Sequence, residues 1–280
     1  MRLTFATYNI HRCVGRDGRY DPPRIRDVIN ELDADVIAVQ EIDTPDRHGL
    51  ELAHWLGEES KYQVIAGPTL LERKGHHGNA VFTRCQRGEV RLVDFSLPAY
   101  EPRGAIDLDL SCAGVTIQVI ATHLGLRPWE RRVQVERLLQ CVRANCVLMG
   151  DFNEWWLWGR PLRAIKAIFG PTPALATFPS FRPALALDRI WIRPTGRVQS
   201  IAVHRTRRSA RASDHLPLKA VVEWESEQNT HAKAESLPIR RSSPREPHWS
   251  MPSGALTAID RSGSATRSGR DVSMTLSARP

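Results

Sequence analysis

Along residues 3–223, apolar runs typical of strands alternate with segments in which apolar residues recur at helical spacing. This order predicts an α/β protein. Short apolar runs, some continuous and some alternating with polar residues, are typical of buried and half-buried strands. The alternation between 90 and 121 favours antiparallel strands with one buried face. The predicted strands cover 3–9, 35–41, 62–66, 80–82, 90–95, 105–110, 115–121, 147–149, 187–192 and 220–224.

Helical spacing fills several gaps between these strands. Asp21 followed by Pro22 is typical of a helix N-cap and first turn, and apolar residues follow at helical intervals up to Leu32. Further helices are predicted over Leu50–Leu56, around Val135–Val142 and from near Pro161. The histidine-containing stretch 72–79 is expected to be a solvated loop. The strand–helix–strand order at the N-terminus is the beginning of an α/β layer.

Composition divides the chain into two parts. Its 280 residues, 41% of them hydrophobic and 25% charged, can bury a full core. The periodic pattern ends near Glu225, and the remainder is rich in Ser, Pro, Arg and Gly with few clustered apolar residues. We therefore predict one domain over 1–225 and a disordered basic tail over 226–280. A basic arm that binds nucleic acid is the alternative for the tail.

The net charge of +8 favours anionic partners such as nucleic acid, phospholipid headgroups or phosphorylated metabolites. The five cysteines stand at unrelated spacings without a zinc-binding pattern, so we expect reduced thiols in a cytoplasmic protein. The N-terminus shows no signal-peptide pattern, and no apolar run is long enough for a transmembrane segment. A monomer is expected.

Polar residues follow the predicted strand over 147–149 in a pattern that can support chemistry. Gly150 permits a sharp exit from the strand, and Asp151 and Asn153 then lie at its tip. A carboxylate and an amide at this spacing suit a hard cation or an attacking water. An Asx turn explains the same residues if they act alone.

Similar residues interrupt the ends of other apolar strands. If the strand ends lie on one rim of two packed sheets, these groups converge in a cleft of carboxylates, amides and two imidazoles. That combination suits hydrolysis of a phosphate ester with a divalent metal. The residues concerned are Asn9, Glu41, His123, Asp151, Asn153, Asp188, Asp214 and His215.

Seven short motifs carry a resemblance to the endonuclease/exonuclease/phosphatase family, in matching order throughout residues 3–223. This resemblance implies a four-layer sandwich, in which two mixed β-sheets pack face to face with helices outside. The motifs are Thr7-Tyr8-Asn9, Gln40-Glu41, Gly78-Asn79-Ala80, Thr122-His123-Leu124, Gly150-Asp151-Phe152-Asn153, Leu187-Asp188-Arg189-Ile190 and Ser213-Asp214-His215.

The resemblance also implies a metal site. Glu41 matches the principal Mg²⁺ ligand of the family, with Asn9 close by and Asp214 contributing from the far side. A set of oxygen ligands favours Mg²⁺ or Mn²⁺ over zinc.

Catalytic roles follow from the same resemblance. His215 matches the catalytic histidine, held by Asp188 as a triad acid orients its base. Asp151 is expected to orient or deprotonate the attacking water, while Asn153 and His123 hydrogen-bond the phosphoryl oxygens.

Two substrate-binding residues are also expected. Asn79 matches a family motif. Arg103 either contacts phosphate or is an exposed structural arginine.

The family defines the chemistry better than the substrate. The favoured function is a Mg²⁺-dependent phosphodiesterase or nuclease, and the alternative is a phosphomonoesterase or a phosphodiesterase of phospholipid headgroups. From another class, an inactive member would bind nucleic acid or a protein.

Substrate clues are limited to Trp155, Trp156 and Trp158, which can stack on bases, meet lipid or pack beneath the next helix. We expect at least one ring to be buried and at least one exposed.

Overall fold

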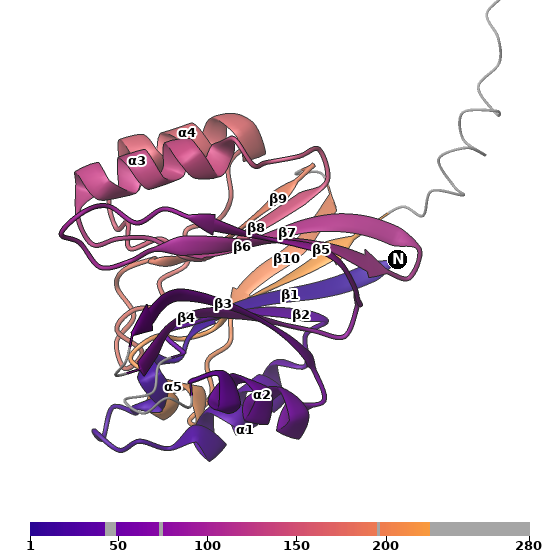
Figure 1. Ribbon diagram of the computed structural model, residues 1–280. Helices are drawn as coiled ribbons and strands as arrows, with labels where there is room; N and C mark the ends of the chain where they lie inside the picture. Colours follow the sequence, from indigo (N-terminus) through magenta and orange to yellow (C-terminus); the bar gives the residue numbers. More distant parts are fainter. Residues whose placement is uncertain (43–48, 73–74, 195–196, 225–280) are drawn as a thin grey trace, which may run out of the picture. The chain divides into compact units, whose positions relative to one another are not determined.

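Two mixed β-sheets pack against each other, and helices cover the outer face of each (Figure 1). This computed structural model describes residues 1–42, 49–72, 75–194 and 197–224, without the side chains of 49, 50, 68–72 and 75–77. The predicted tail, 226–280, lies outside the described residues. Among the helices that are described, none is both long enough and apolar enough to cross a membrane.

The first sheet has six strands in the order β10-β11-β1-β2-β4-β3. Its central pair, β1 and β2, is parallel, and all its other pairs are antiparallel. The strands are β1 (Arg2–Asn9), β2 (Val36–Gln40), β3 (Gln63–Glu72), β4 (Gly75–Thr83), β10 (Val198–Val203) and β11 (Leu218–Glu223).

The second sheet has five strands in the order β5-β6-β7-β8-β9. Again one central pair, β7 and β8, is parallel and the other pairs are antiparallel. The strands are β5 (Gln86–Asp94), β6 (Gly104–Cys112), β7 (Val115–His123), β8 (Cys146–Asp151) and β9 (Asp188–Arg193).

Helices complete the four layers that the family resemblance implies (Figure 1). In α1, the Asp21 side chain accepts a hydrogen bond from the backbone nitrogen of Arg24, and the apolar face is fully buried. Helices α1 (Pro22–Leu32) and α2 (Gly49–Ser60) cover the first sheet, and α3 (Pro128–Leu139) and α4 (Arg160–Phe169) cover the second. Two short elements, the 3₁₀ turn η1 (His11–Cys13) and α5 (Ser209–Ala212), lie beside α1.

The main core lies between the sheets. Phe5 of β1, Val147 of β8 and Trp224 after β11 belong to one buried cluster there. Because helices cover the outer faces, the inner strands are buried on both sides, and every residue of β2 and β8 is buried. This explains why these two strands are continuous apolar runs in the sequence.

The topology brings many strand ends to one rim. Strands β1, β2, β7 and β8 end there, and the antiparallel strands β9 and β11 begin there. Asp188, the first residue of β9, pairs with Asp151, the last of β8. The predicted convergence of polar strand ends therefore follows from the strand order.

The expectation of a loop over 72–79 is wrong. Strand β3 continues through Glu72 and β4 begins at Gly75, because the two strands form an antiparallel ladder in which Gly67 pairs with Asn79. Strand β10 and helix α5 were not predicted. Both are peripheral and short, and β10 exposes about every second residue.

The expectation of five reduced thiols is also wrong. Cys85 and Cys112 form a disulfide. The register of β5 and β6 pairs Gln86 with Ser111, so the next pair outward places the two cysteines face to face, with their Cα atoms 4.9 Å apart. The other three cysteines, Cys13, Cys141 and Cys146, are free thiols.

Candidate active site

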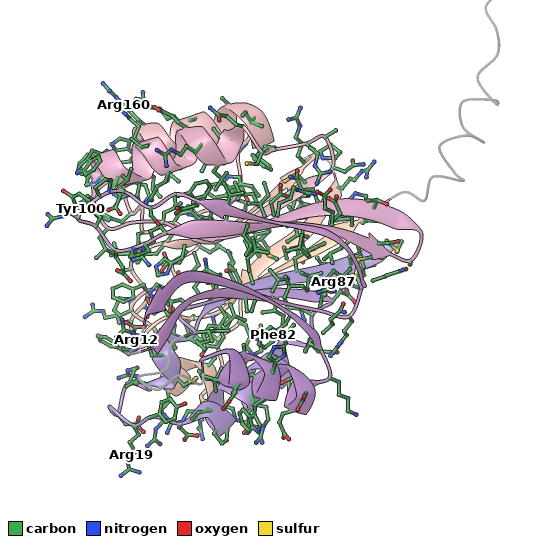
Figure 2. The ribbon with its side chains drawn as sticks, viewed as in Figure 1. Arg12, Arg19, Phe82, Arg87, Tyr100 and Arg160 are labelled. Carbon is green, nitrogen blue, oxygen red and sulfur yellow. A yellow bond between two sulfur atoms is a disulfide. The ribbon has the colours of Figure 1, made fainter. Side chains whose placement is uncertain are left out.

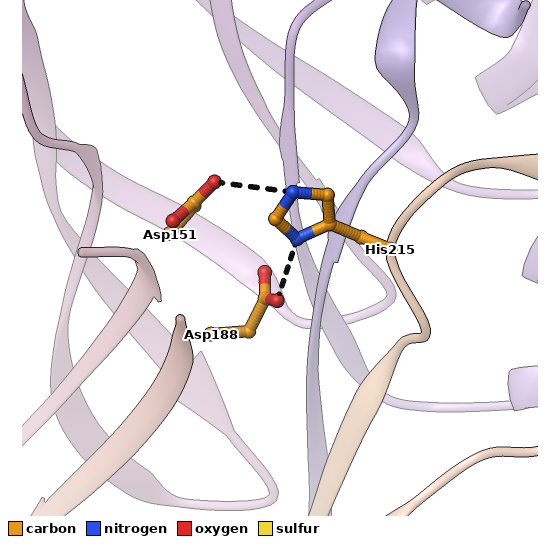
Figure 3. Close-up of side chains that lie close together, drawn as sticks. All are labelled: Asp151, Asp188 and His215. Carbon is orange, nitrogen blue, oxygen red and sulfur yellow. Dashed lines mark hydrogen bonds and ion pairs between the residues drawn. The ribbon is translucent and has the colours of Figure 1, made fainter. Parts of the chain in front are cut away.

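A histidine–aspartate pair lies at the centre of the rim (Figure 3). His215 Nδ1 lies 2.8 Å from Asp188 Oδ2, and His215 Nε2 lies 3.8 Å from Asp151 Oδ2. All three side chains are buried, and Asp188 is fully inaccessible to solvent. The imidazole therefore lies between two carboxylates: it is within hydrogen-bond distance of Asp188 and faces Asp151 at a longer distance.

Asp188 is fixed by its own surroundings. The Thr177 hydroxyl donates to Asp188 Oδ2 over 2.6 Å, so this oxygen serves both the threonine and the histidine. The ring of Phe178 packs on the imidazole, with centroids 4.9 Å apart. Both contacts hold the ring of His215 in one orientation.

Asp151 contacts three further polar residues of the site, Asn9, Asn153 and His123. Its Oδ2 accepts a hydrogen bond of 3.1 Å from Asn9 Nδ2, and its Oδ1 accepts one of 2.9 Å from the backbone nitrogen of Asn153. His123 Nε2 lies 3.6 Å from the same Oδ2. Asp151 thus contacts residues from both sheets.

The surroundings of Asp151 and His215 raise the pKa values of both side chains. Burial raises the pKa of Asp151 to about 6, an effect that the nearby His215 partly offsets. Burial by itself would lower the pKa of His215, but the carboxylates of Asp188 and Asp151 outweigh it and raise that pKa to about 10. In the metal-free protein, His215 is therefore a cation at neutral pH, and Asp151 titrates close to neutrality.

Glycine at position 150 lets β8 approach β7 closely. Gly150 has a φ of 153°, and a Cβ atom here would lie 1.9 Å from the carbonyl oxygen of Thr122. The glycine that the sequence marks as a sharp exit is therefore also required for the strand pairing that places Asp151 beside His123.

Glu41 extends the network on the side of the first sheet. It follows β2 with a φ of 57°, a left-handed conformation that costs about 1 kcal/mol for a residue with a side chain. Its Oε1 accepts a hydrogen bond of 2.9 Å from Asn9 Nδ2, the same nitrogen that donates to Asp151. Asn9 therefore brings two carboxylates to one point.

The arrangement at this point fits a hard cation. The ligands on offer are carboxylate oxygens, and the raised pKa of Asp151 reflects a buried negative charge that lacks full compensation. Asn9 Oδ1 accepts from the backbone nitrogen of His11, so ligation by this oxygen would require the amide to turn. Oxygen and nitrogen atoms of Asp151, Asp188 and His215 also lie within 4.8 Å of one another, in a cluster that could hold a metal.

His123 lies between a cation and an amide. Arg103 Nη1 is 3.4 Å from its Nδ1, and Asn153 Nδ2 is 3.0 Å from its Nε2. Arg103 is only 7% exposed and forms an ion pair of 2.8 Å with Glu101. The alternative of an exposed structural arginine is therefore wrong, because this side chain packs behind the histidine.

Asp214 and Asn79 lie at the periphery of the site. The Asp214 carboxylate is partly exposed and faces His11 Nδ1 at 3.8 Å. Asn79 is buried beside the end of β2, where the next residue, Ala80, pairs with Val39. Both lie on the rim, outside the tight cluster around Asp151.

Three contributors to the site were missed by the sequence interpretation. Thr177 and Phe178 lie in an irregular segment without periodicity, and they reach the site only because Phe178 bridges to Leu185 ahead of β9. Ser213 belongs to a recognised motif, but its role was not predicted: its hydroxyl donates a hydrogen bond of 2.8 Å to the carbonyl oxygen of Asn9, a residue 204 positions away in the chain. No local sequence signal indicates such contacts.

The expectation that at least one tryptophan of the central loop is buried is wrong. Trp155, Trp156 and Trp158 are 54%, 48% and 66% exposed. The side chain that packs inward from this loop is Glu154, which forms a buried ion pair of 3.2 Å with Arg131. The charged residue is thus inside and the aromatic residues are outside.

A known protein family matches most of the chain. The model of the endonuclease/exonuclease/phosphatase family matches residues 6–215. The chain belongs to this family. Its members are phosphoesterases, including nucleases and phosphatases. The resemblance drawn from the seven motifs is confirmed, as is the four-layer fold.

Relatives of known sequence and structure cover most of the chain. The uncharacterized protein YbhP of Escherichia coli K12 is 31% identical, over 77% of this chain and 94% of its own. A family member from Beutenbergia cavernae superposes with a TM-score of 0.65 at 23% identity, covering 79% of this chain and 71% of its own. A mannosyl-6-phosphatase of Bacteroides thetaiotaomicron superposes with a TM-score of 0.62 at 20% identity, covering 79% and 100%. At 23% and 20% sequence identity, the similarity of this chain to these two solved structures establishes a shared fold and nothing more.

Proposed function

We propose that this protein is a Mg²⁺- or Mn²⁺-dependent hydrolase that cleaves phosphodiesters by direct attack of water. The observation that carries the proposal is the His215–Asp188 pair, whose free imidazole nitrogen faces the carboxylate of Asp151 at 3.8 Å. The imidazole and the carboxylate that faces it form an acid–base pair suited to hydrolysis of a phosphate ester.

Within this pair we assign distinct roles. Asp151, whose pKa is raised by burial in the metal-free protein, accepts a proton from the attacking water. His215, whose pKa is raised by the carboxylates of Asp188 and Asp151 in the metal-free protein, donates its Nε2–H to a phosphoryl oxygen as negative charge develops there. Asp188 keeps the ring oriented and charged.

The neighbouring residues complete the substrate site. Asn153 and His123 are assigned to hydrogen-bond the phosphoryl oxygens, for which Asn153 Nδ2 would exchange its contact with His123 Nε2 for one with the substrate, and Arg103 adds positive charge beside His123. We also propose Asn79, which is buried beside the end of β2, as a contact for the ester group.

The metal is proposed to bind at Glu41, with Asn9 and Asp214 beside it. A bound divalent cation would polarise a phosphoryl oxygen and offset the carboxylates. Two features of the chain support a metal at this position. Asn9 Nδ2 donates to the carboxylates of both Glu41 and Asp151, and the left-handed backbone of Glu41 directs its carboxylate toward Asn9.

The charge of the site favours diesters over monoesters. Glu41 and Asp151 bring two carboxylates to Asn9, Asp188 adds a third beside the imidazole, and a phosphomonoester carries one more negative charge than a diester at neutral pH. The diester therefore meets less repulsion. A phosphomonoesterase remains the alternative that the experiment must separate.

The test is hydrolysis of bis-p-nitrophenyl phosphate and p-nitrophenyl phosphate with Mg²⁺, Mn²⁺ or EDTA. We expect metal-dependent cleavage with a preference for the diester, and its loss in Asp151→Asn and His215→Ala. Asp33→Asn is the matched control, because this carboxylate is 73% exposed and lies just before β2, at the end of the first sheet remote from the rim. Preference for the monoester would select the alternative, and inactivity on every ester with either metal would refute the proposal.

A further inference from the structure

An exposed aromatic surface lies beside the rim, on the first turn of α3 and on the two loops that precede α3 and α4. Its six apolar side chains are between 39% and 66% exposed, which is far more than large apolar residues of a soluble domain usually show together. We call it the tryptophan surface. It consists of Leu126, Trp129, Trp155, Trp156, Leu157 and Trp158.

Buried polar contacts hold this surface in place from below. The Arg131 guanidinium donates to Glu154 and to the carbonyl oxygens of Gly125 and Leu126, while Glu154 accepts from the backbone nitrogen of Trp156. Lys166 of α4 donates to the carbonyl of Leu157. The two loops are therefore tied to each other and to both helices, and the apolar side chains are displayed on an ordered support.

A pocket of about 430 Å³ opens within the tryptophan surface. Trp129, Trp155 and Trp156 line it together with Pro128 and Pro161, and Arg132 and Arg160 contribute positive charge. Tyr100 packs edge-on against Trp129, with centroids 5.0 Å apart, and so extends the apolar area. Figure 2 shows Tyr100 and Arg160 projecting at the same end of the sheet and helices that they flank.

Positive charge surrounds the apolar area. Arg127, Arg132, Arg160 and Arg163 are all exposed around it. The exposed acid that pairs with this group is Glu136, 3.6 Å from Arg132, whereas Glu130 and Glu154 are buried beneath the surface. Exposed tryptophan and leucine within a ring of arginine are typical of proteins that insert into the interface of an anionic membrane.

The ring geometry favours lipid over stacked bases. Trp156 lies between Trp155 and Trp158, at centroid distances of 5.4 and 5.5 Å and with steep interplanar angles of 71° and 75°. The steep angles turn neighbouring ring planes away from one another, so the three rings do not form the parallel platform on which successive bases stack. Leu126 and Leu157 add aliphatic area, which favours insertion among acyl chains and gives bases nothing to stack on.

We propose that the tryptophan surface binds the surface of an anionic phospholipid bilayer, with its pocket receiving part of one lipid. The surface adjoins the rim, since Trp155 lies only two residues beyond Asn153. Bound in this way, the protein holds its candidate active site next to lipid phosphate. That consequence rests on the proposed function, whereas the binding itself does not.

The test measures co-sedimentation of the full-length protein with vesicles in EDTA, where no turnover is required. Vesicles of phosphatidylcholine are compared with vesicles that also contain phosphatidylglycerol. We expect binding to the anionic vesicles, weakened about tenfold by Trp156→Ala and by Trp158→Ala, because each change removes one inserted ring. Tyr20→Ala is the matched control, since this aromatic residue is 54% exposed outside the tryptophan surface and should leave binding unchanged.

Three results would overturn the proposal. The first is the absence of binding to anionic vesicles, and the second is equal binding by the wild type and both tryptophan variants. The third is weakened binding of a single-stranded oligonucleotide by these variants without any effect on vesicles, which would assign the surface to nucleic acid. Circular dichroism and thermal melts of each variant show that a loss of binding is not a loss of fold. The tail is the same in every variant, so its positive charge cannot produce the difference.

Discussion

Replacing Asp188 by asparagine should cost the enzyme roughly 10- to 150-fold in kcat while leaving its fold intact. The asparagine has the same shape, but it cannot provide the ionised partner that His215 Nδ1 contacts at 2.8 Å. A hydrogen bond to a charged group contributes about 1.5–3 kcal/mol, and each factor of ten in rate corresponds to about 1.4 kcal/mol. The predicted range follows from these two values.

A neighbouring residue supplies the graded control. Thr177→Val removes the second hydrogen bond to Asp188 Oδ2, of 2.6 Å, but leaves the carboxylate charged. This donor holds the carboxylate and does not touch the imidazole, so only part of its contribution reaches His215 and the loss should be smaller than that caused by Asp188→Asn. The order of activity should therefore be wild type, then Thr177→Val, then Asp188→Asn.

The assay is steady-state hydrolysis of bis-p-nitrophenyl phosphate at saturating Mg²⁺, combined with a double-mutant cycle. Because Asp188 acts through His215, the double variant with His215→Ala should be barely less active than His215→Ala alone. Multiplied losses in the double variant, or an Asp188→Asn enzyme as active as the wild type, would show that the two residues do not act as a pair.

Three further changes test the fold and the electrostatics. Gly150→Ala should lower the free energy of unfolding by about 2–4 kcal/mol in urea melts, since its Cβ meets the carbonyl of the paired strand. Glu154→Gln should cost about 3–5 kcal/mol by leaving a buried arginine unpaired, whereas the exposed Glu136→Gln should cost less than about 1 kcal/mol; equal costs would contradict this. Because the pKa of His215 rises from 6.5 to about 10 on folding, its ionisation stabilises the metal-free protein fully below pH 6.5, and this contribution disappears as the pH rises through about 10. Asp188→Asn should flatten that pH dependence in the same melts.

The polar strand ends could be predicted from sequence because each marks the end of an apolar run. Asn9, His123 and Asp151 are the last residues of their strands, and a parallel pairing brings such ends together. The strand order itself, which joins the two sheets at one rim, came from the family resemblance.

What could not be predicted depends on contacts between distant segments. Thr177 reaches Asp188 through an irregular chain, and the Cys85–Cys112 disulfide requires the register of β5 and β6. Neither leaves a periodic signal. The expected burial of tryptophan failed for a related reason, because the interior position beneath this loop is taken by the ion pair of Glu154 with Arg131.

The most direct test of the proposed chemistry is a Mg²⁺ titration of bis-p-nitrophenyl phosphate hydrolysis by the wild type and by Glu41→Gln, each first stripped with EDTA. The account predicts no hydrolysis without metal, saturable activation of the wild type, and activation of Glu41→Gln only at much higher Mg²⁺ with unchanged thermal stability of the metal-free proteins. Hydrolysis that persists in EDTA, or two superimposable titration curves, would contradict a metal site at Glu41 and with it the proposed mechanism.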